Sequence, residues 1–312
     1  MQYNDTSLLH IINERLQLIW EAHGLGNIWT ITRPARGSIN YCLIVNNAYV
    51  IRFDITGKIV SRFQSESLAY QYLHHSGVPV PQVVALDQSK ELVPYEYLIT
   101  SRLAGTPVID SWSDLSVQER ERIAYEAGSY LAVIHSHTFD RFGKLRDLAS
   151  GGFACWYDYS ADYFHRYARQ ALDLGIIEMS LRDKMQAILE QYRPLWDAVT
   201  KGSLVHSDYH FENILQHNGA VSGILDFEWA YSGDPTGDLV AEDLWEQMCP
   251  GSKPFVYAGY TSLRQLDPNH DLKMALYKLY IYLEFLVDSK RRADEDEFQQ
   301  VYTKLQAALQ GL

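Results

Sequence analysis

The stretch LVHSDYHFENILQHNGAVSGILDFEWAYSGDPTGDL, residues 204–239 of a 312-residue chain, decides the fold. It places Asp208 and Asn213 in a His-x-Asp-x-x-x-x-Asn frame and Asp226 in an Asp-Phe-Glu triplet. Two apolar, β-prone arms flank the Asn-Gly pair at 218–219, which is typical of a type I′ turn because both central residues need a positive φ. We therefore expect a hairpin that returns Asp226 to the side of Asp208 and Asn213.

Two carboxylates and an amide in one place suit phosphoryl transfer. That reaction requires a hydroxyl in line with the γ-phosphate and neutralisation of charge by Mg²⁺. Mg²⁺ prefers hard oxygen ligands, usually one or two carboxylates with phosphates and water. We expect Asn213 and Asp226 to hold Mg²⁺ and Asp208 to accept the hydroxyl proton. The frame matches the kinase H-R-D-x-x-x-x-N and D-F-G motifs, with Ser207 at the Arg position and Glu228 at the Gly position.

These motifs resemble the aminoglycoside phosphotransferase and choline kinase superfamily, small-molecule kinases with a protein-kinase-like fold. The resemblance rests on His206-Ser207-Asp208, Asn213, Ile224-Leu225-Asp226-Phe227-Glu228, Gly233-Asp234-Pro235 and Asp238-Leu239. It implies an α+β, two-lobed fold: a nucleotide-binding lobe with a small antiparallel sheet, residues 1–103, and a mainly helical catalytic and acceptor-binding lobe, residues 104–312. It also implies Mg²⁺ and ATP, with GTP possible, as cofactors, and Asp238 as a brace for the backbone N–H groups of the catalytic loop.

The resemblance assigns further residues to the nucleotide. Arg52 occupies the place of the strand lysine that contacts the α- and β-phosphates, and Glu66 on the next helix is its expected partner. Two loops supply the other candidates: Gly37, Ser38 and Asn40 over the phosphates, and Ser101 and Leu103 in the linker between the lobes, where backbone groups bind adenine. An ordinary hairpin loop, a solvated strand arginine and an exposed helix acid are the alternative interpretations.

Charge is distributed unevenly along the chain. The net charge is −12, while the first 104 residues carry eight acidic and eight basic side chains, so the whole acidic excess follows them. This argues against nucleic acid or an anionic membrane as a partner and favours a small, hydroxylated, cationic acceptor. An aminoglycoside is the expected acceptor from the resemblance, and choline, ethanolamine or another amino alcohol is the alternative. A solubilising acidic surface would also explain the charge.

Cysteine usage and apolar patterns predict the cellular location and the secondary structure. The three cysteines lie far apart and no apolar run approaches the ~20 residues of a membrane span, so we expect a cytoplasmic protein. An aromatic tract over 151–167 predicts helix packing or, alternatively, an aromatic and acidic wall for a cation. We expect strands over 28–33, 41–45, 48–53, 82–86 and 95–103, and helices over 7–23, 62–75, 116–137, 239–248, 271–289 and 294–309.

Two other classes of protein compete with a kinase. In a metallohydrolase, His206, Asp208 and His210 would alternate along a strand as metal ligands. That hypothesis leaves the Asn213 frame, the hairpin and Asp226 unexplained. In a nucleotide-binding pseudokinase the catalytic base need not be kept, so the intact motifs argue against it. For His206 we expect a structural hydrogen bond, and for Glu228 either a role at the metal or substrate or a structural one.

Overall fold

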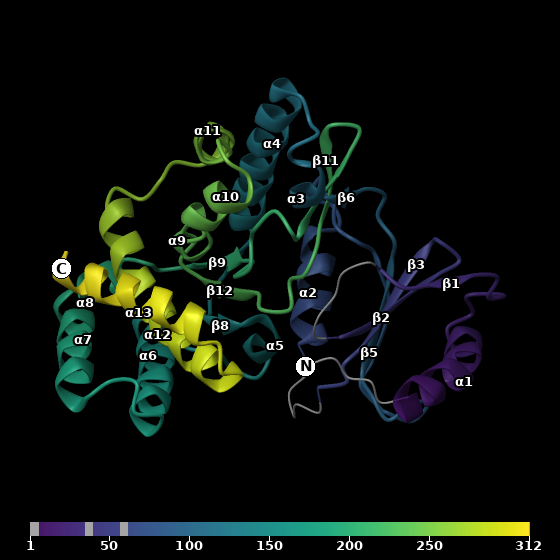
Figure 1. Ribbon diagram of the computed structural model, residues 1–312, viewed down its shortest axis with the longest axis horizontal. Coiled ribbons are helices and arrows are strands. Elements are labelled where there is room, and N and C mark those ends of the chain that lie inside the picture. Colours follow the sequence, from purple (N-terminus) through teal and green to yellow (C-terminus); the bar gives the residue numbers. More distant parts are fainter. Residues whose placement is uncertain (1–5, 35–39, 57–61, 312) are drawn as a thin grey trace.

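The computed structural model of the protein describes residues 6–34, 40–56 and 62–311 (Figure 1). Its N-terminal part contains one antiparallel sheet in the strand order β1-β2-β3-β5-β4. The strands are β1 Ile31–Thr32, β2 Tyr41–Val45, β3 Tyr49–Phe53, β4 Val83–Asp87 and β5 Tyr97–Ser101. Helix α1, Thr6–Ala22, packs on this sheet, and helix α2, Phe63–Leu73, lies between the sheet and the C-terminal part (Figure 1).

Local sequence explains how this sheet forms. Side chains of β2 alternate between buried and half-buried, as a strand with one face on a core requires. Asn46 and Asn47 have φ of 54° and 52°, and asparagine tolerates this left-handed turn between β2 and β3 better than most residues. The predicted strand over 28–33 is shorter than expected, because only Ile31 and Thr32 pair with β2.

The C-terminal part is mainly helical and contains two small sheets, ordered β7-β9-β12-β8 and β11-β10-β6 (Figure 1). The strands are β6 Thr106–Pro107, β7 Thr138–Phe139, β8 Gly143–Lys144, β9 Gly202–Val205, β10 Ile214–His217, β11 Ala220–Ile224 and β12 Tyr231–Gly233. The helices are α3 Val108–Ser111, α4 Val117–Ser136, α5 Leu145–Leu148, α6 Trp156–Asp173, α7 Met179–Gln191, α8 Arg193–Asp197, α9 Thr236–Leu239, α10 Glu242–Met248, α11 Lys253–Leu263, α12 His270–Arg292 and α13 Glu295–Gln310.

The predicted hairpin is confirmed in β10 and β11. Asn218 and Gly219 have φ of 53° and 68°, as a type I′ turn requires, and residues 217 and 220 pair across it. Helix α4 fixes the hairpin from the side, because Arg122 Nε donates to the carbonyl oxygen of Gly219 at 2.6 Å and Glu126 accepts the backbone N–H of Val221 at 2.8 Å. The strand that leads to Asp226 is therefore held at the end where it leaves the turn.

Helix α4 is the central support of the C-terminal part. Its start is the predicted capping box, in which Ser116 accepts the backbone N–H of Glu119 and the Glu119 side chain accepts that of Ser116. Farther along, Gly128 faces Gly259 of α11 so closely that a Cβ at residue 128 would overlap the carbonyl group of Val256. The backbones of α4 and α11 therefore touch, and only glycine allows this approach.

The predicted α+β architecture is confirmed, with an antiparallel sheet in the N-terminal region and helices in the C-terminal region. Among the described residues, no helix combines the length and the apolarity needed to cross a membrane. The boundary between residues 103 and 104 stays a prediction. It falls between the end of β5 at Ser101 and the start of β6 at Thr106.

Candidate active site

The carboxylate of Asp208 and the amide of Asn213 lie in contact in the loop between β9 and β10. Nδ2 of Asn213 donates to Oδ2 and to the backbone oxygen of Asp208, both at 3.0 Å. Nε2 of His210 lies 3.1 Å from Oδ1 of Asp208. Burial alone would raise the pKa of Asp208, but the hydrogen bond and charge of His210 hold it below its ordinary value. Asp208 is therefore ionised at neutral pH, as a proton acceptor must be.

The hairpin brings Asp226 back to this pair, as predicted. The backbone N–H of Leu225 donates to the carbonyl oxygen of Asn213 at 2.9 Å. Asp226 itself has a φ of 67°, and its N–H donates to the hydroxyl of Tyr70 at 3.1 Å. Its Oδ1 is buried and accepts no hydrogen bond from the described residues. Burial is the main cause that raises the pKa of Asp226 to about 6.

The oxygens of Asn213 and Asp226 fit a divalent cation. Asn213 uses its amide nitrogen for Asp208, and no donor in the described part of the chain contacts its amide oxygen. Oδ1 of Asp226 is buried without a hydrogen-bond donor from the described residues, and its ion-pair partner, Nη1 of Arg52, is 3.9 Å away, so this oxygen can still bind a metal ion. These are the hard oxygen ligands that Mg²⁺ prefers, and a cation there would lower the pKa of Asp226.

Arg52 extends the site into the N-terminal sheet. It forms the predicted ion pair with the buried Glu66, and its Nη1 lies 3.9 Å from Oδ1 of Asp226. The Tyr70 hydroxyl donates to Glu66 at 2.6 Å while accepting the N–H of Asp226. Burial alone would lower the pKa of Arg52, but Glu66 and then Asp226 raise it above its ordinary value. A fixed positive charge therefore lies next to Asp226.

Asp238 braces the catalytic loop in the way that we predicted. Its buried carboxylate accepts the backbone N–H groups of His206 at 2.8 Å and Ser207 at 2.6 Å. Nε2 of His135 lies 2.9 Å from the same carboxylate. Ser207 has a φ of 73°, so these bonds hold a backbone conformation that serine rarely adopts.

The environment of His206 argues against the metallohydrolase hypothesis. Its Nε2 lies 2.9 Å from the carbonyl oxygen of Leu225, and its Nδ1 accepts the backbone N–H of Asp208 at 3.2 Å. Both ring nitrogens are thus engaged within the protein, which leaves neither free for a metal. His206 is the structural hydrogen-bonding residue that we expected, and its ring also packs on Phe227 with centroids 4.2 Å apart.

Glu228 joins the two parts of the molecule. Its buried carboxylate pairs with Nη1 of Arg62 at 3.1 Å, and Nδ2 of Asn40 donates to it at 3.4 Å. The Arg62 guanidinium also lies 3.8 Å from the ring centroid of Trp229. Burial and then Asp226 raise the pKa of Glu228 above its ordinary value. Since both carboxylate oxygens have protein partners, the structure favours the structural role of Glu228.

The remaining nucleotide candidates differ in their surroundings. The backbone N–H of Ser101 donates to the carbonyl oxygen of Gln82 at 2.8 Å, so the sheet already uses this group. The backbone N–H of Leu103 has no protein partner among the described residues, as an adenine-binding group requires. Asn40 lies beside Glu228, whereas Gly37 and Ser38 lie outside the described residues.

Two residues of the site were not predicted. Tyr70 connects Glu66 to Asp226, and its sequence signal is its position four residues after Glu66, on the same face of α2. Arg62 pairs with Glu228 across 166 residues of sequence, and no local pattern indicates this contact. The family motifs thus identify the catalytic loop better than its connection to α2.

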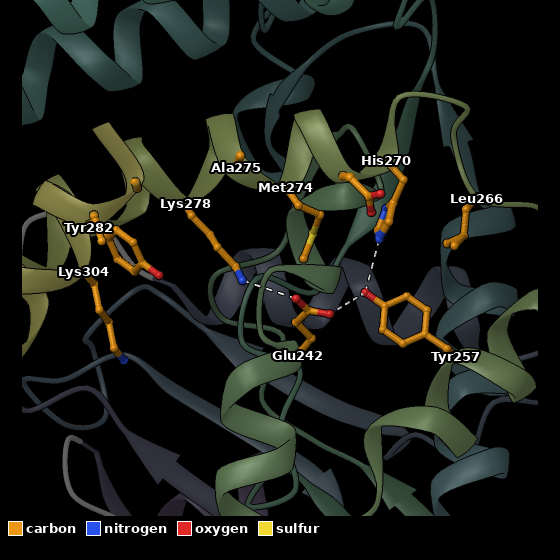
Figure 2. A pocket seen from close by; sticks show the side chains of 12 residues that line it. Glu242, Tyr257, Leu266, His270, Met274, Ala275, Lys278, Tyr282 and Lys304 are labelled. Atoms are coloured by element: carbon orange, nitrogen blue, oxygen red, sulfur yellow. Dashed lines mark hydrogen bonds and ion pairs between the residues drawn. The ribbon is translucent and has the colours of Figure 1, made fainter. Parts of the chain in front are cut away.

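A cavity of about 650 Å³ lies elsewhere, among helices α10 to α13. Figure 2 shows its side chains, including Glu242 bonded to Lys278 and Tyr257. Neither Asp208, Asn213 nor Asp226 lines it. Two acids line this cavity: Glu242, whose carboxylate already has Lys278 and Tyr257 as partners, and Asp271.

Solved structures define the class of protein to which this fold belongs. The GDP complex of wild-type aminoglycoside 2'-phosphotransferase-IIIa is 18% identical and covers 96% of this chain and 98% of its own, with a TM-score of 0.68. The streptomycin and ATP ternary complex of APH(2")-IIa is 16% identical and covers 98% and 97%, with a TM-score of 0.65. The chain therefore has the predicted fold of the protein-kinase-like small-molecule kinases.

Sequence comparison then identifies the family. The chain belongs to the phosphotransferase enzyme family, whose model matches residues 30–260. Hygromycin-B 4-O-kinase from Escherichia coli is 21% identical over 201 residues, which are 63% of this chain. The match spans 56% of the length of that relative. The predicted superfamily and class of enzyme are thereby confirmed.

Proposed function

We propose that this protein transfers the γ-phosphoryl group of a nucleoside triphosphate, ATP or GTP, to a hydroxyl of a small molecule. The observation that carries the proposal is the convergence of Asp208, Asn213 and Asp226 with Arg52, whose Nη1 lies 3.9 Å from Oδ1 of Asp226. Relatives of known structure support the nucleotide, since they are described as complexes with GDP and ATP.

Each side chain has one role in this reaction. Asp208 accepts the proton of the acceptor hydroxyl, whose oxygen forms a bond to the γ-phosphorus as the bond to the β–γ bridging oxygen breaks. Arg52, oriented by Glu66, neutralises charge on the phosphates. Asn40 and the backbone of Leu103 would lie near the phosphates and the adenine. Gly37, Ser38 and Ser101 are proposed only from the resemblance.

Asn213 and Asp226 would hold Mg²⁺. When bound, the ion neutralises charge on the β- and γ-phosphates and orients them. The buried Oδ1 of Asp226 supports this assignment, because it accepts no hydrogen bond from the described residues and its ion-pair partner, Nη1 of Arg52, is 3.9 Å away. The lobe boundary at 103 and 104 and a cytoplasmic location, where nucleoside triphosphates are abundant, belong to the same proposal.

The proposed acceptor is a small hydroxylated molecule that carries an amine. Its amine follows from the acidic excess after residue 104 and from the relatives, which are named for hygromycin B or described with streptomycin. An aminoglycoside is the first candidate and an amino alcohol such as choline or ethanolamine is the second. No nucleic acid or membrane partner belongs to the proposal.

Release of ADP or GDP, measured with a panel of hydroxylated amines, tests this function. Asp208→Ala should lower turnover about 10²- to 10⁴-fold, because it removes the proton acceptor. Nucleotide binding, measured by isothermal titration calorimetry with Mg²⁺, should change little. The exposed Asp140 provides a matched control as Asp140→Ala. Unchanged turnover in Asp208→Ala would remove this residue from its role, and tight nucleotide binding without turnover of any acceptor would favour a pseudokinase.

A further inference from the structure

Lys144 lies at the catalytic end of the sheet β7-β9-β12-β8. Tyr231 of β12 pairs with Lys144 on one side and with Val205 on the other, so the three residues form a row. Both neighbours are antiparallel to β12, and therefore β8 and β9 end at the same edge of the sheet. With strands about 4.8 Å apart, the backbone of Lys144 is about 10 Å from Val205. Asp208 follows Val205 by three residues at this edge.

In the described residues, the ammonium group of Lys144 forms no ion pair. Nζ donates to the carbonyl oxygen of Trp229 at 2.8 Å and lies 5.5 Å and 5.3 Å from the ring centroids of Trp229 and Tyr231. The side chain is half-buried, and no carboxylate lies within ion-pair distance of Nζ in the described residues. A desolvated cation whose direct contacts in the described residues are a carbonyl oxygen and two ring faces is well placed to gain from an anionic ligand.

The acidic group whose charge acts most strongly on Lys144 is a glutamate of α12. Glu284 of α12 accepts hydrogen bonds from the hydroxyls of Tyr163 and Tyr167 of α6. No lysine or arginine in the described part of the chain forms an ion pair with Glu284. The two hydroxyls hold the carboxylate in place and leave it open to a cation.

An aromatic face connects these two charges. Trp156, Tyr159, Tyr163 and Tyr167 recur at helical spacing and share one side of α6. The rings of Trp156 and Tyr159 both stack on Tyr231, with centroids 5.9 Å apart, beside Lys144. One helix face thus leads from the surroundings of Lys144 to Glu284. The cavity in Figure 2 is separate, because Tyr282 lies about 200° around α12 from Glu284.

We propose that Lys144 and Glu284 are the two charged contacts of the acceptor, and that the acceptor is a hydroxylated zwitterion with both an amine and a carboxylate. The amine donates to Glu284, the carboxylate accepts from Lys144, and the hydroxyl lies at Asp208. This inference rests on the proposed phosphoryl transfer and narrows its substrate class. A polycationic aminoglycoside or a simple amino alcohol would leave the Lys144 ammonium unpaired or repelled.

The charges around Lys144 support this assignment. Burial is the main cause that lowers the pKa of Lys144 to about 8; Glu284 opposes this shift, and Arg146, Arg166 and Arg62 add to it. The protein environment thus disfavours the ammonium form of Lys144 in the absence of a ligand, although this form predominates at neutral pH. A carboxylate bound next to Nζ would relieve this repulsion, whereas an amine bound there would add to it.

Matched acceptors test the proposal. L-Homoserine, 3-aminopropan-1-ol and 4-hydroxybutanoate present the same hydroxyl, but the second lacks the carboxylate and the third lacks the amine. Serine, ethanolamine and 3-hydroxypropanoate repeat the comparison with one carbon fewer, and kanamycin supplies a polycation without an acid. In one of the two trios, we expect kcat/KM for the amino acid to exceed the kcat/KM of the amine and of the hydroxy acid at least about tenfold. Each of these two compounds lacks one of the charged hydrogen bonds that the amino acid forms.

Variants assign the preference to its residues. Lys144→Met should lower the ratio of kcat/KM for the amino acid to that for the amine about 10- to 100-fold, whereas Lys144→Arg should restore it. Glu284→Gln should lower the ratio of amino acid to hydroxy acid in the same way. Lys201→Met, at an exposed lysine, is the matched control and should change neither ratio.

The outcomes separate this inference from the proposed function. An amine or kanamycin that reacts as well as any amino acid, or a ratio that Lys144→Met does not change, would overturn the zwitterionic acceptor while phosphoryl transfer stands. Absence of nucleotide turnover with every acceptor, despite binding of Mg²⁺ and ATP, would instead overturn the proposed function itself and the inference with it.

Discussion

Asp238→Asn tests how firmly the catalytic loop depends on one buried carboxylate. Asp238 is 1% exposed, and its two oxygens accept the N–H groups of His206 and Ser207 and face Nε2 of His135. Asparagine has one acceptor oxygen and one donor nitrogen at these positions. Whichever way its amide turns, a donor faces a backbone N–H, so at least one of these two N–H groups loses its partner.

The expected loss is large for so small a change in shape. Hydrogen bonds to a charged group contribute about 1.5–3 kcal/mol each, and an unsatisfied buried donor costs about 1–3 kcal/mol. With one such donor and weaker remaining bonds, we expect the free energy of unfolding to fall by about 3 kcal/mol. Ser207 would then relax from its φ of 73° and displace Asp208. A displacement of about 1 Å corresponds to roughly a hundredfold loss of turnover.

Urea unfolding followed by far-ultraviolet circular dichroism measures the first effect, and nucleoside diphosphate release measures the second. Asp243→Asn is the control, because Asp243 lies on α10 with a 64% exposed side chain bonded to Lys278. That variant should stay within about 0.5 kcal/mol of the native protein. The reasoning is refuted if Asp238→Asn unfolds and turns over like the control.

Two further predictions concern stability. Gly128→Ala should lower the free energy of unfolding by about 2–4 kcal/mol, because its Cβ would lie within 2.7 Å of the Val256 carbonyl carbon. Gly311→Ala is the control and should be neutral, because a Cβ there makes only ordinary van der Waals contact. Equal urea midpoints for the two variants would contradict this prediction. The free energy of unfolding of the native protein should also rise relative to Lys144→Met between pH 8 and 10. The pKa of Lys144 is about 8 in the folded protein and 10.5 when unperturbed, so the unfolded chain binds more protons in that window. A difference independent of pH would show that Lys144 titrates normally.

Local sequence was sufficient for the catalytic loop. The Asn218-Gly219 turn, the Ser116 capping box and the spacing of Asp208 to Asn213 act over a few residues, where turn geometry and hydrogen bonding leave few alternatives. Helices α1, α2, α4, α12 and α13 agree with the predicted ranges within a few residues because their apolar periodicity is long.

Contacts between distant segments were beyond such reasoning. Strands β6, β7 and β8 have only two residues each, too few for any periodic signal, although β8 positions Lys144. The aromatic tract gave the expected helix packing at Trp156 and Phe164, both buried. The acid that accepts hydrogen bonds from this tract is Glu284, over a hundred residues away in the sequence. Only the fold reveals that pairing.

The last position of strand β8 has an evolutionary consequence. Its backbone pairs with Tyr231 whatever side chain it carries, and the phosphoryl-transfer residues lie on other segments. A single codon change there could redirect the choice of acceptor without disturbing folding or the handling of nucleotide. Relatives that share this scaffold can therefore diverge in what they modify much faster than in how they modify it.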